Sequence, residues 1–222
     1  MAQPWRTPDW EFKGLEHGFA PRSTPVPTEL KLVRANQVHG ARILVVDKTT
    51  PVPAGEADGL ITRAPGVAVA IATADCVPIL LAAPQAKIVA AVHAGWRGSL
   101  AGIAPRAIEL FAELFQVEAS SIQAALGPSI GGCCYEIERD IAKKFADKYG
   151  EEAWTAWYEG SAGKGNLDLR EMNRILLLRA GMSAESIHRV GPCTGCGSTE
   201  LASYRVEGPG TGRQLSWIGL ER

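Results

Sequence analysis

The sequence predicts an α+β fold with a mixed β-sheet. Apolar segments of strand length come in groups in the first half of the chain, whereas the clearest helical patterns come late, unlike a strict βαβ alternation. No stretch rich in Pro, Gly or Ser and no run of like charges divides the chain, and no repeat of fixed period is present. We therefore expect residues 1–222 to form a single domain.

Short apolar segments between Gly, Pro and polar residues predict the strands. We expect strands at 16–19, 30–33, 41–46, 58–62, 67–73, 77–83, 88–93, 122–126, 187–190 and 214–218. The longest apolar run, 67–83, contains Asp75 and Pro78, so it predicts two buried strands with a break between them rather than a membrane-spanning helix. The short turn Pro84-Gln-Ala-Lys87 joins the second of these strands to the next one.

Apolar residues recur with the 3.6-residue period of a helix in three later segments, at 100–115, 135–149 and 168–181. Pro105 lies inside the first segment, so that helix either kinks at the proline or begins near it. Asp168-Leu-Arg-Glu171 has the spacing of a capping box and Gly181 is a typical residue for a helix end, which together delimit the third helix. Glu136 falls at the start of the second helix, where a capping role for its carboxylate competes with a catalytic one; we expect the cap.

Charge and composition narrow the class of protein. The 222 residues include 23 Lys and Arg against 24 Asp and Glu, so no strong positive field exists to attract nucleic acid or an anionic membrane. The first residues, MAQPWRTPDWEF, do not resemble a secretory signal peptide. We therefore expect a cytoplasmic protein that acts on a small molecule, without nucleic-acid or membrane partners, whose five cysteines are free thiols or metal ligands.

Three metal-ligating side chains stand at the ends of predicted strands. His39 precedes one strand, Cys76 lies at the break between two buried strands, and His93 ends another. Two imidazoles and one thiolate bind Zn²⁺ and leave a fourth position open, as in a catalytic site. Their spacing in the sequence matches no short ligand motif, so the residues alone favour two hydrogen-bonded histidines and an inert core thiol.

The other four cysteines invite a second metal hypothesis. Cys193-Thr-Gly-Cys196 has the spacing of a zinc ribbon, but the remaining pair, Cys133 and Cys134, is adjacent in the sequence. Adjacent cysteines do not match the gap of two to four residues usual in such sites, so the sequence disfavours a Cys₄ zinc site. A redox pair at Cys193 and Cys196 is equally disfavoured, because no thioredoxin-like βαβ unit surrounds it.

Several motifs occur together and in a characteristic order, from about residue 16 to the C-terminus. They are Asn36-Gln-Val-His-Gly40, Ala57-Asp-Gly59, Thr73-Ala-Asp-Cys-Val-Pro78, Val92-His-Ala-Gly-Trp-Arg-Gly98, Gly127-Pro-Ser-Ile-Gly-Gly-Cys-Cys-Tyr-Glu136, Cys193-Thr and Ser203-Tyr-Arg205. In this set the chain resembles the YfiH-like, laccase-domain family, also called polyphenol oxidase or multifunctional purine nucleoside phosphorylase.

The resemblance implies a fold, a metal site and an activity. The implied fold is an αβ sandwich with mixed β-sheets flanked by helices, of the YfiH/CNF-like type related to cysteine hydrolases. The implied metal is Zn²⁺, with Cu²⁺ as a further possibility, held by His39, Cys76 and His93. The implied reactions are phosphorolysis of adenosine, inosine and guanosine, with adenosine deamination alongside.

Other residues in these motifs are candidates for catalysis and substrate binding. We expect Asp75, beside Cys76, to orient a ligand imidazole or to accept a proton, since a carboxylate in an apolar run needs a polar role. Arg97 and Arg205 are candidates to bind phosphate in a bidentate manner, with surface ion pairs as the alternative. The substrate-binding candidates are Asn36, Gln37, Arg97, Tyr204 and Arg205, although Asn36 and Gln37 could instead fix the turn before His39.

Two departures from the family pattern concern the substrate site. The loop between Phe19 and Gln37 is shorter than in the family and rich in proline, and Val206 stands where a second arginine often follows Ser203-Tyr-Arg205. The first change bears on substrate specificity, and the second removes one expected contact to an anion.

Three other functions remain as alternatives. A metal-free thiol hydrolase would use Cys76 as nucleophile and His93 as base, with an amidase that edits cell-wall precursors as a related case. Copper-dependent polyphenol oxidation is disfavoured, because a multicopper cluster needs more imidazoles than the four histidines of this chain provide. A binding module without catalysis is also disfavoured, since no charge stripe or exposed aromatic patch is evident.

Overall fold

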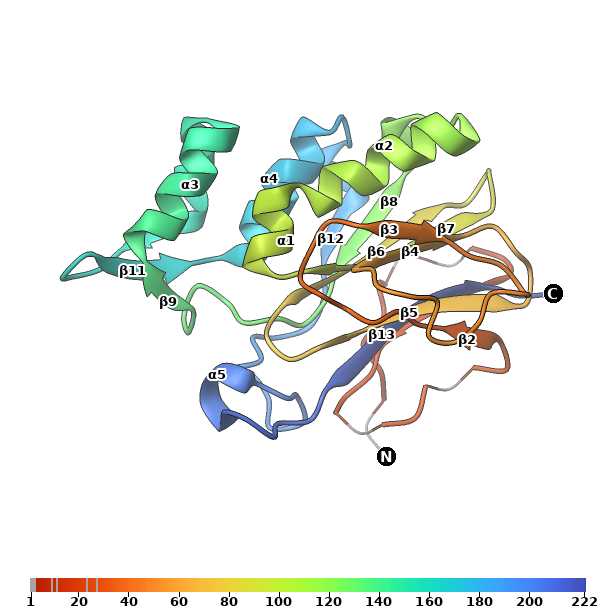
Figure 1. Ribbon diagram of the computed structural model, residues 1–222, viewed down its shortest axis with the longest axis horizontal. Helices are drawn as coiled ribbons and strands as arrows, with labels where there is room; N and C mark the ends of the chain where they lie inside the picture. The colour runs from red at the N-terminus through yellow and green to blue at the C-terminus, as the bar shows by residue number, and fades with distance from the viewer. Residues whose placement is uncertain (1–2, 9, 11, 23, 27) are drawn as a thin grey trace.

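Two β-sheets pack face to face, and helices cover the outer face of the larger sheet (Figure 1). This is a computed structural model that describes residues 3–8, 10, 12–22, 24–26 and 28–222. The arrangement confirms the predicted α+β sandwich of mixed sheets and helices. No helix within the described residues is long and apolar enough to cross a membrane.

The larger sheet has six strands in the order β12-β8-β6-β7-β4-β3. Their bounds are β3 Ile43–Val45, β4 Gly59–Thr62, β6 Val77–Ala83, β7 Ile88–Ala94, β8 Gln123–Leu126 and β12 Ile187–Arg189. The central strands β6 and β7 are buried on both faces, which explains why they are apolar throughout rather than alternating. In β6, for example, Ile79 and Leu81 face the helices while Leu80 and Ala82 face the second sheet.

The second sheet has four strands in the order β1-β13-β5-β2. Their bounds are β1 Leu15–Phe19, β2 Lys31–Val33, β5 Val67–Thr73 and β13 Gln214–Leu220. One face packs on the larger sheet through Val67, Val69, Ile71 and Ile218. The predicted break between 67–73 and 77–83 is confirmed, because β5 and β6 belong to different sheets and residues 74–76 cross from one to the other.

Three helices cover the larger sheet: α1 Trp96–Ala101, α2 Ile103–Phe115 and α4 Leu169–Arg179. The chain breaks at Gly102, whose φ of 97° suits glycine, and Pro105 lies in the first turn of α2. The expectation that a helix begins near Pro105 is therefore confirmed. The cap of α4 is also confirmed, since the Glu171 N–H donates to the Asp168 carboxylate at 2.9 Å.

A smaller sheet with the order β10-β11-β9 projects from one end together with α3 (Figure 1). The bounds are β9 Glu136–Glu138, α3 Arg139–Tyr149, β10 Trp157–Glu159 and β11 Lys164–Leu167. The predicted helix start at residue 135 was wrong, and so was the helix cap at Glu136. Residues 136–138 instead form a strand that pairs with β11. Their side chains alternate, with Ile137 buried and the glutamates on either side exposed.

The remaining elements are short. They are α5 Tyr204–Glu207 and the 3₁₀ turns η1 Ala119–Ser121, η2 Glu151–Ala156 and η3 Ala184–Ser186. Helix α5 stands between β12 and β13 in the sequence and lies away from the helical layer (Figure 1). It carries one wall of the pocket described next.

Candidate metal centre

His39, Cys76 and His93 meet at one edge of the larger sheet. One ligand atom from each side chain lies within 4.8 Å of those of the other two. Antiparallel pairing sets Pro78 opposite His93, so the residue just before β6 lies beside the end of β7. His39 comes from the loop before β3, and its ring meets that of His93 edge-on with centroids 4.8 Å apart. The three predicted ligands are therefore neighbours in space, although 37 and 17 residues separate them along the chain.

Asp58, for which no role was predicted from the sequence, positions the side chains of this centre. Its fully buried carboxylate accepts a hydrogen bond from His93 Nδ1 at 2.8 Å, which leaves Nε2 of that ring for the centre. The same carboxylate accepts the backbone N–H groups of Val38, His39 and Gly40 at 3.2, 2.9 and 2.7 Å. These bonds hold His39 in a left-handed conformation, with a φ of 61°. A carboxylate directly before the buried strand β4 was the sequence signal for such a residue.

The electrostatics of the three side chains are coupled. Burial raises the pKa of the Cys76 thiol, but hydrogen bonds to His39 and His93 outweigh it and lower that pKa to about 7. Burial lowers the pKa of His93, but hydrogen bonds to Asp58 and Cys76 raise it to about 9. A metal ion binds a thiolate and a neutral imidazole, so it would take the place of the proton that His93 shares with Cys76.

The donor set fits a single divalent ion. Two imidazoles and one thiolate suit Zn²⁺ or Cu²⁺. The Gly95 backbone packs against two of the three ligands. A Cβ at this position would lie 2.9 Å from Cys76 Sγ and 3.3 Å from His39 Cδ2. The Asp58 contact to His93 Nδ1 is the outer-shell carboxylate that metal-binding histidines commonly have.

A pocket of about 610 Å³ opens over the three ligands. Besides His39, Cys76 and His93, its wall includes Asp75, Trp96, Arg97, Tyr135, Tyr204, Arg205 and Arg213. Three arginines against one aspartate give the pocket a positive balance that suits an anion. Its three aromatic side chains supply surfaces on which a flat ring can stack.

The arginines differ in how they are held. The Arg97 guanidinium lies over the Trp96 ring at 4.3 Å, and no described residue accepts a hydrogen bond from it. Arg205 donates to the Glu136 carbonyl at 2.7 Å and lies over Tyr135 at 5.2 Å. Arg213 was not predicted from the sequence, because an isolated arginine before the last strand carries no motif. Its Nη1 donates to the carbonyls at the preceding positions 211 and 212, at 3.0 and 2.9 Å.

Asp75 lines the pocket but does not contact a ligand imidazole through a hydrogen bond; Asp58 makes that contact. One Asp75 oxygen accepts from the Thr194 hydroxyl at 2.6 Å and the other from the Arg205 N–H at 2.7 Å. The Asp75 carboxylate therefore ties the loop before α5 to the loop that carries Cys76.

The remaining predicted substrate-binding residues fall into two groups. Tyr204 and Gln37 line the pocket, whereas Asn36 is exposed and is not part of its wall. The Gln37 side-chain amide pairs with the backbone N–H and carbonyl of Ala72, at 2.8 Å each, so it fixes the turn before His39. Val206 is 63% exposed and lies outside the pocket wall.

Comparison with known proteins identifies the family of the chain. The family model described as "Multi-copper polyphenol oxidoreductase laccase" matches residues 22–221. The chain belongs to this laccase-domain family. A purine nucleoside phosphorylase, YlmD of Geobacillus stearothermophilus, is 39% identical over 197 residues, covering 84% of this chain and 71% of the relative. An adenosine deaminase from an unknown prokaryotic organism is 36% identical, covering 84% and 74%.

Solved structures of laccase-domain proteins share the fold. The crystal structure of YlmD from Geobacillus stearothermophilus gives a TM-score of 0.90 at 31% identity, over 100% of this chain and 98% of that one. A Bacillus licheniformis protein named YfiH gives a TM-score of 0.86 at 27% identity, over 95% and 94%.

The site does not fit the multicopper cluster that the family description names. Of the four histidines in this laccase-domain chain, only His39 and His93 line the pocket. His17 is buried in β1, where it accepts the Thr7 N–H at 3.1 Å, and His188 lies on β12 beside Gln123. Two imidazoles and one thiolate hold one ion, which is too few ligands for the cluster of a laccase.

Proposed function

We propose that this laccase-domain chain is a zinc-dependent purine nucleoside phosphorylase acting on adenosine, inosine and guanosine, with adenosine deamination as a second activity. The observation that carries the proposal is one pocket in which a His₂Cys ligand set, three arginines and three aromatic rings converge. The relatives named as purine nucleoside phosphorylase and adenosine deaminase support an enzyme that acts on small purine substrates.

Different residues of the pocket wall bind the phosphate and the purine in phosphorolysis. In that reaction the bond between ribose C1′ and the purine nitrogen breaks, and a phosphate oxygen forms the new bond to C1′. Arg97, Arg205 and Arg213 hold the phosphate by charge-assisted hydrogen bonds. Trp96 and Tyr204 offer ring faces for the purine. A divalent ion bound by His39, Cys76 and His93 would supply Lewis-acid chemistry at the end of the pocket.

Asp75 is the proton-handling group in this proposal. The departing purine takes up one proton, and the deamination reaction also requires proton transfer to the leaving amine. Asp75 lies in the pocket wall beside Cys76, with Thr194 and the Arg205 backbone fixing its carboxylate. That fixed position is what a general acid or base needs, because proton transfer depends on hydrogen-bond geometry.

The direct test is release of free base from inosine or adenosine with and without inorganic phosphate, followed by chromatography. We expect base and ribose 1-phosphate in equal amounts and only when phosphate is present. Release of base at the same rate without phosphate would show hydrolysis and overturn the proposal.

Arg213→Ala should weaken phosphate binding more than nucleoside binding. A charge-assisted hydrogen bond contributes ~1.5–3 kcal/mol, so we expect KM for phosphate to rise about 10- to 100-fold while KM for the nucleoside changes little. Initial rates at varied phosphate concentration measure the effect. Arg63→Ala removes an exposed arginine outside the pocket wall and serves as the control. Equal KM values for phosphate in both variants would exclude Arg213 from this role.

A second candidate function is a thiol hydrolase, and one arrangement favours it. Cys76, His93 and Asp58 follow each other as thiol, imidazole and carboxylate, the order of a nucleophile, its base and the residue that orients the base. The two functions predict different states of the sulfur, because a metal-bound thiolate is not a free nucleophile.

Alkylation of Cys76 by iodoacetamide distinguishes the two states. In protein stripped of metal, the reactive Cys76 thiolate forms as the pH rises through its pKa of about 7. The rate of alkylation should therefore reach half of its maximum near pH 7, whereas an ordinary thiol reaches it near pH ~8.5. Mass spectrometry of the peptide that contains Cys76 gives the rate. We expect Zn²⁺ in excess over both cysteine-containing clusters to suppress the reaction. Full alkylation of Cys76 at that zinc concentration would favour the hydrolase instead.

A further inference from the structure

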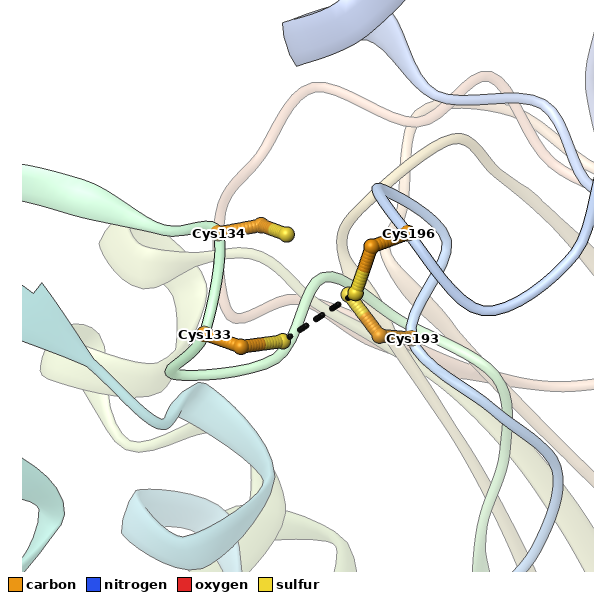
Figure 2. Close-up of side chains that lie close together, drawn as sticks. All are labelled: Cys133, Cys134, Cys193 and Cys196. Atoms are coloured by element: carbon orange, nitrogen blue, oxygen red, sulfur yellow. Dashed lines mark hydrogen bonds between the residues drawn. The ribbon is translucent and has the colours of Figure 1, made fainter.

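The four cysteines outside the pocket form a second cluster, which we call the Cys₄ cluster: Cys133, Cys134, Cys193 and Cys196. Their four sulfur atoms lie within 4.8 Å of one another, and Cys133 Sγ lies 3.5 Å from Cys196 Sγ. Figure 2 shows the pair on the loop after β8 facing the pair on the loop after β12, with all four side chains directed inward. None of the four lines the pocket over His39, Cys76 and His93.

Sheet topology explains this convergence. Strands β8 and β12 are parallel neighbours, so the chain leaves both at the same edge of the sheet. Just beyond, Ser129 and Cys193 form a parallel bridge, and the Thr194 N–H donates to the Ser129 carbonyl at 3.0 Å. The two loops therefore run side by side when they reach their cysteines, although about 60 residues separate them in the sequence.

The geometry matches a tetrahedral metal site. Zn–S bonds of about 2.3 Å place tetrahedral sulfur atoms ~3.8 Å apart, which lies within the observed range of sulfur separations. Cys193 Sγ also accepts the backbone N–H groups of Gly131 and Gly195, at 3.2 and 3.3 Å. N–H donors aimed at sulfur stabilise a thiolate, the form that binds metal.

Both loops are shaped to bring the sulfurs this close. A Cβ at Gly195 would lie 2.9 Å from the Cβ of Cys134, and a Cβ at Gly131 would lie 3.3 Å from the sulfur of Cys133. A side chain at Gly195 would therefore push the two loops apart. The two glycines therefore allow all four thiols to approach one another. A single disulfide would join only two of the cysteines and would not require this close approach of the loops.

We propose that the Cys₄ cluster binds one structural Zn²⁺ ion, separate from the His₂Cys centre. Four thiolates complete a tetrahedral shell, so this ion has no open position for a substrate. Soft thiolate ligands in a tetrahedral S₄ arrangement select zinc or iron over the hard cations. The site therefore has the chemistry of a structural metal rather than a catalytic one.

The Cys₄ cluster also touches the pocket through neighbouring residues. Tyr135, which follows Cys134, lines the pocket, and Thr194, which follows Cys193, donates to Asp75 at 2.6 Å. An ion that joins the two loops would hold Tyr135 and Asp75 at a fixed separation. The structural zinc would thus position one wall of the pocket without contacting the substrate.

Metal analysis of three forms of the full chain tests the proposal. We expect two zinc ions per chain in the wild type, one in Cys76→Ala, and one in the double variant Cys133→Ser with Cys196→Ser. Cys133 and Cys196 are exposed, so the serine substitutions leave the core intact. Cys76→Ala is the matched control, because it removes a thiol from the other centre. Equal zinc content in the wild type and the double variant would overturn the proposal.

X-ray absorption at the zinc edge of Cys76→Ala gives a second test that leaves all four cysteines unchanged. The zinc that remains should have four sulfur neighbours and no nitrogen neighbours. Nitrogen or oxygen neighbours would overturn the proposal. So would iron in place of zinc, or a Cys133–Cys196 disulfide found by peptide mass spectrometry of protein purified without exposure to air.

Discussion

Cys76→Ala should reduce phosphate-dependent base release by more than ~100-fold, the upper end of the effect expected for an outer-shell partner of a metal ligand. The substitution removes the only thiolate of the His₂Cys centre, so both the ion and the coupling to His93 are lost together. The measurement is base formation from inosine at saturating phosphate, with zinc content determined on the same sample.

The control for this prediction is His188→Ala. His188 lies on β12 outside the pocket wall, so its loss should leave both turnover and zinc content near those of the wild type. Unchanged turnover in Cys76→Ala would remove Cys76 from the reaction and with it the proposed metal centre. Lost turnover with full zinc retention would instead favour Cys76 as a nucleophile.

Asp58→Asn should weaken zinc binding at the His₂Cys centre by ~10- to 100-fold, the usual effect of losing an outer-shell carboxylate. Asp58 fixes both histidine ligands, through His93 Nδ1 and through the backbone N–H of His39. An amide has one oxygen where the carboxylate has two, so it cannot accept all four hydrogen bonds. Competition with a chromogenic chelator measures the affinity.

Asp47→Asn is the matched control for Asp58→Asn. Asp47 is also a carboxylate that accepts hydrogen bonds from a turn, in its case from Thr49 and Thr50, but it is exposed and lies outside the pocket wall. We expect its zinc affinity to equal that of the wild type. Equal affinity in both variants would show that Asp58 stabilises the fold without positioning the ligands.

Local patterns predicted most of the elements because burial imposes them on the sequence. The two strands in 67–83 were predicted with their bounds, since strands covered on both faces must be apolar throughout and Asp75 marks the break. The small sheet was missed because β11 contains Lys164, Gly165 and Asn166, which have low strand propensity, and its pairing with β9 holds them in place.

Of the two ligand sets, the His₂Cys centre could be predicted from the sequence and the Cys₄ cluster could not. His39, Cys76 and His93 could be proposed as one set because all three stand at the ends of predicted strands and the family resemblance implies them as ligands, while their spacing carried no such information. The Cys₄ cluster was disfavoured because adjacent Cys133 and Cys134 do not match a zinc ribbon. The structure nevertheless brings Cys193 and Cys196 to them, because β8 and β12 are parallel neighbours.

The amino-acid sequence by itself determined the class of fold, the family and the central strands, since periodicity and burial act over short distances along the chain. Tertiary structure alone decided that Asp58 lies opposite His93, that Arg213 reaches the pocket and that four cysteines converge. These are contacts between segments far apart in sequence. Strand register and loop direction set such contacts, and neither leaves a local pattern in the sequence.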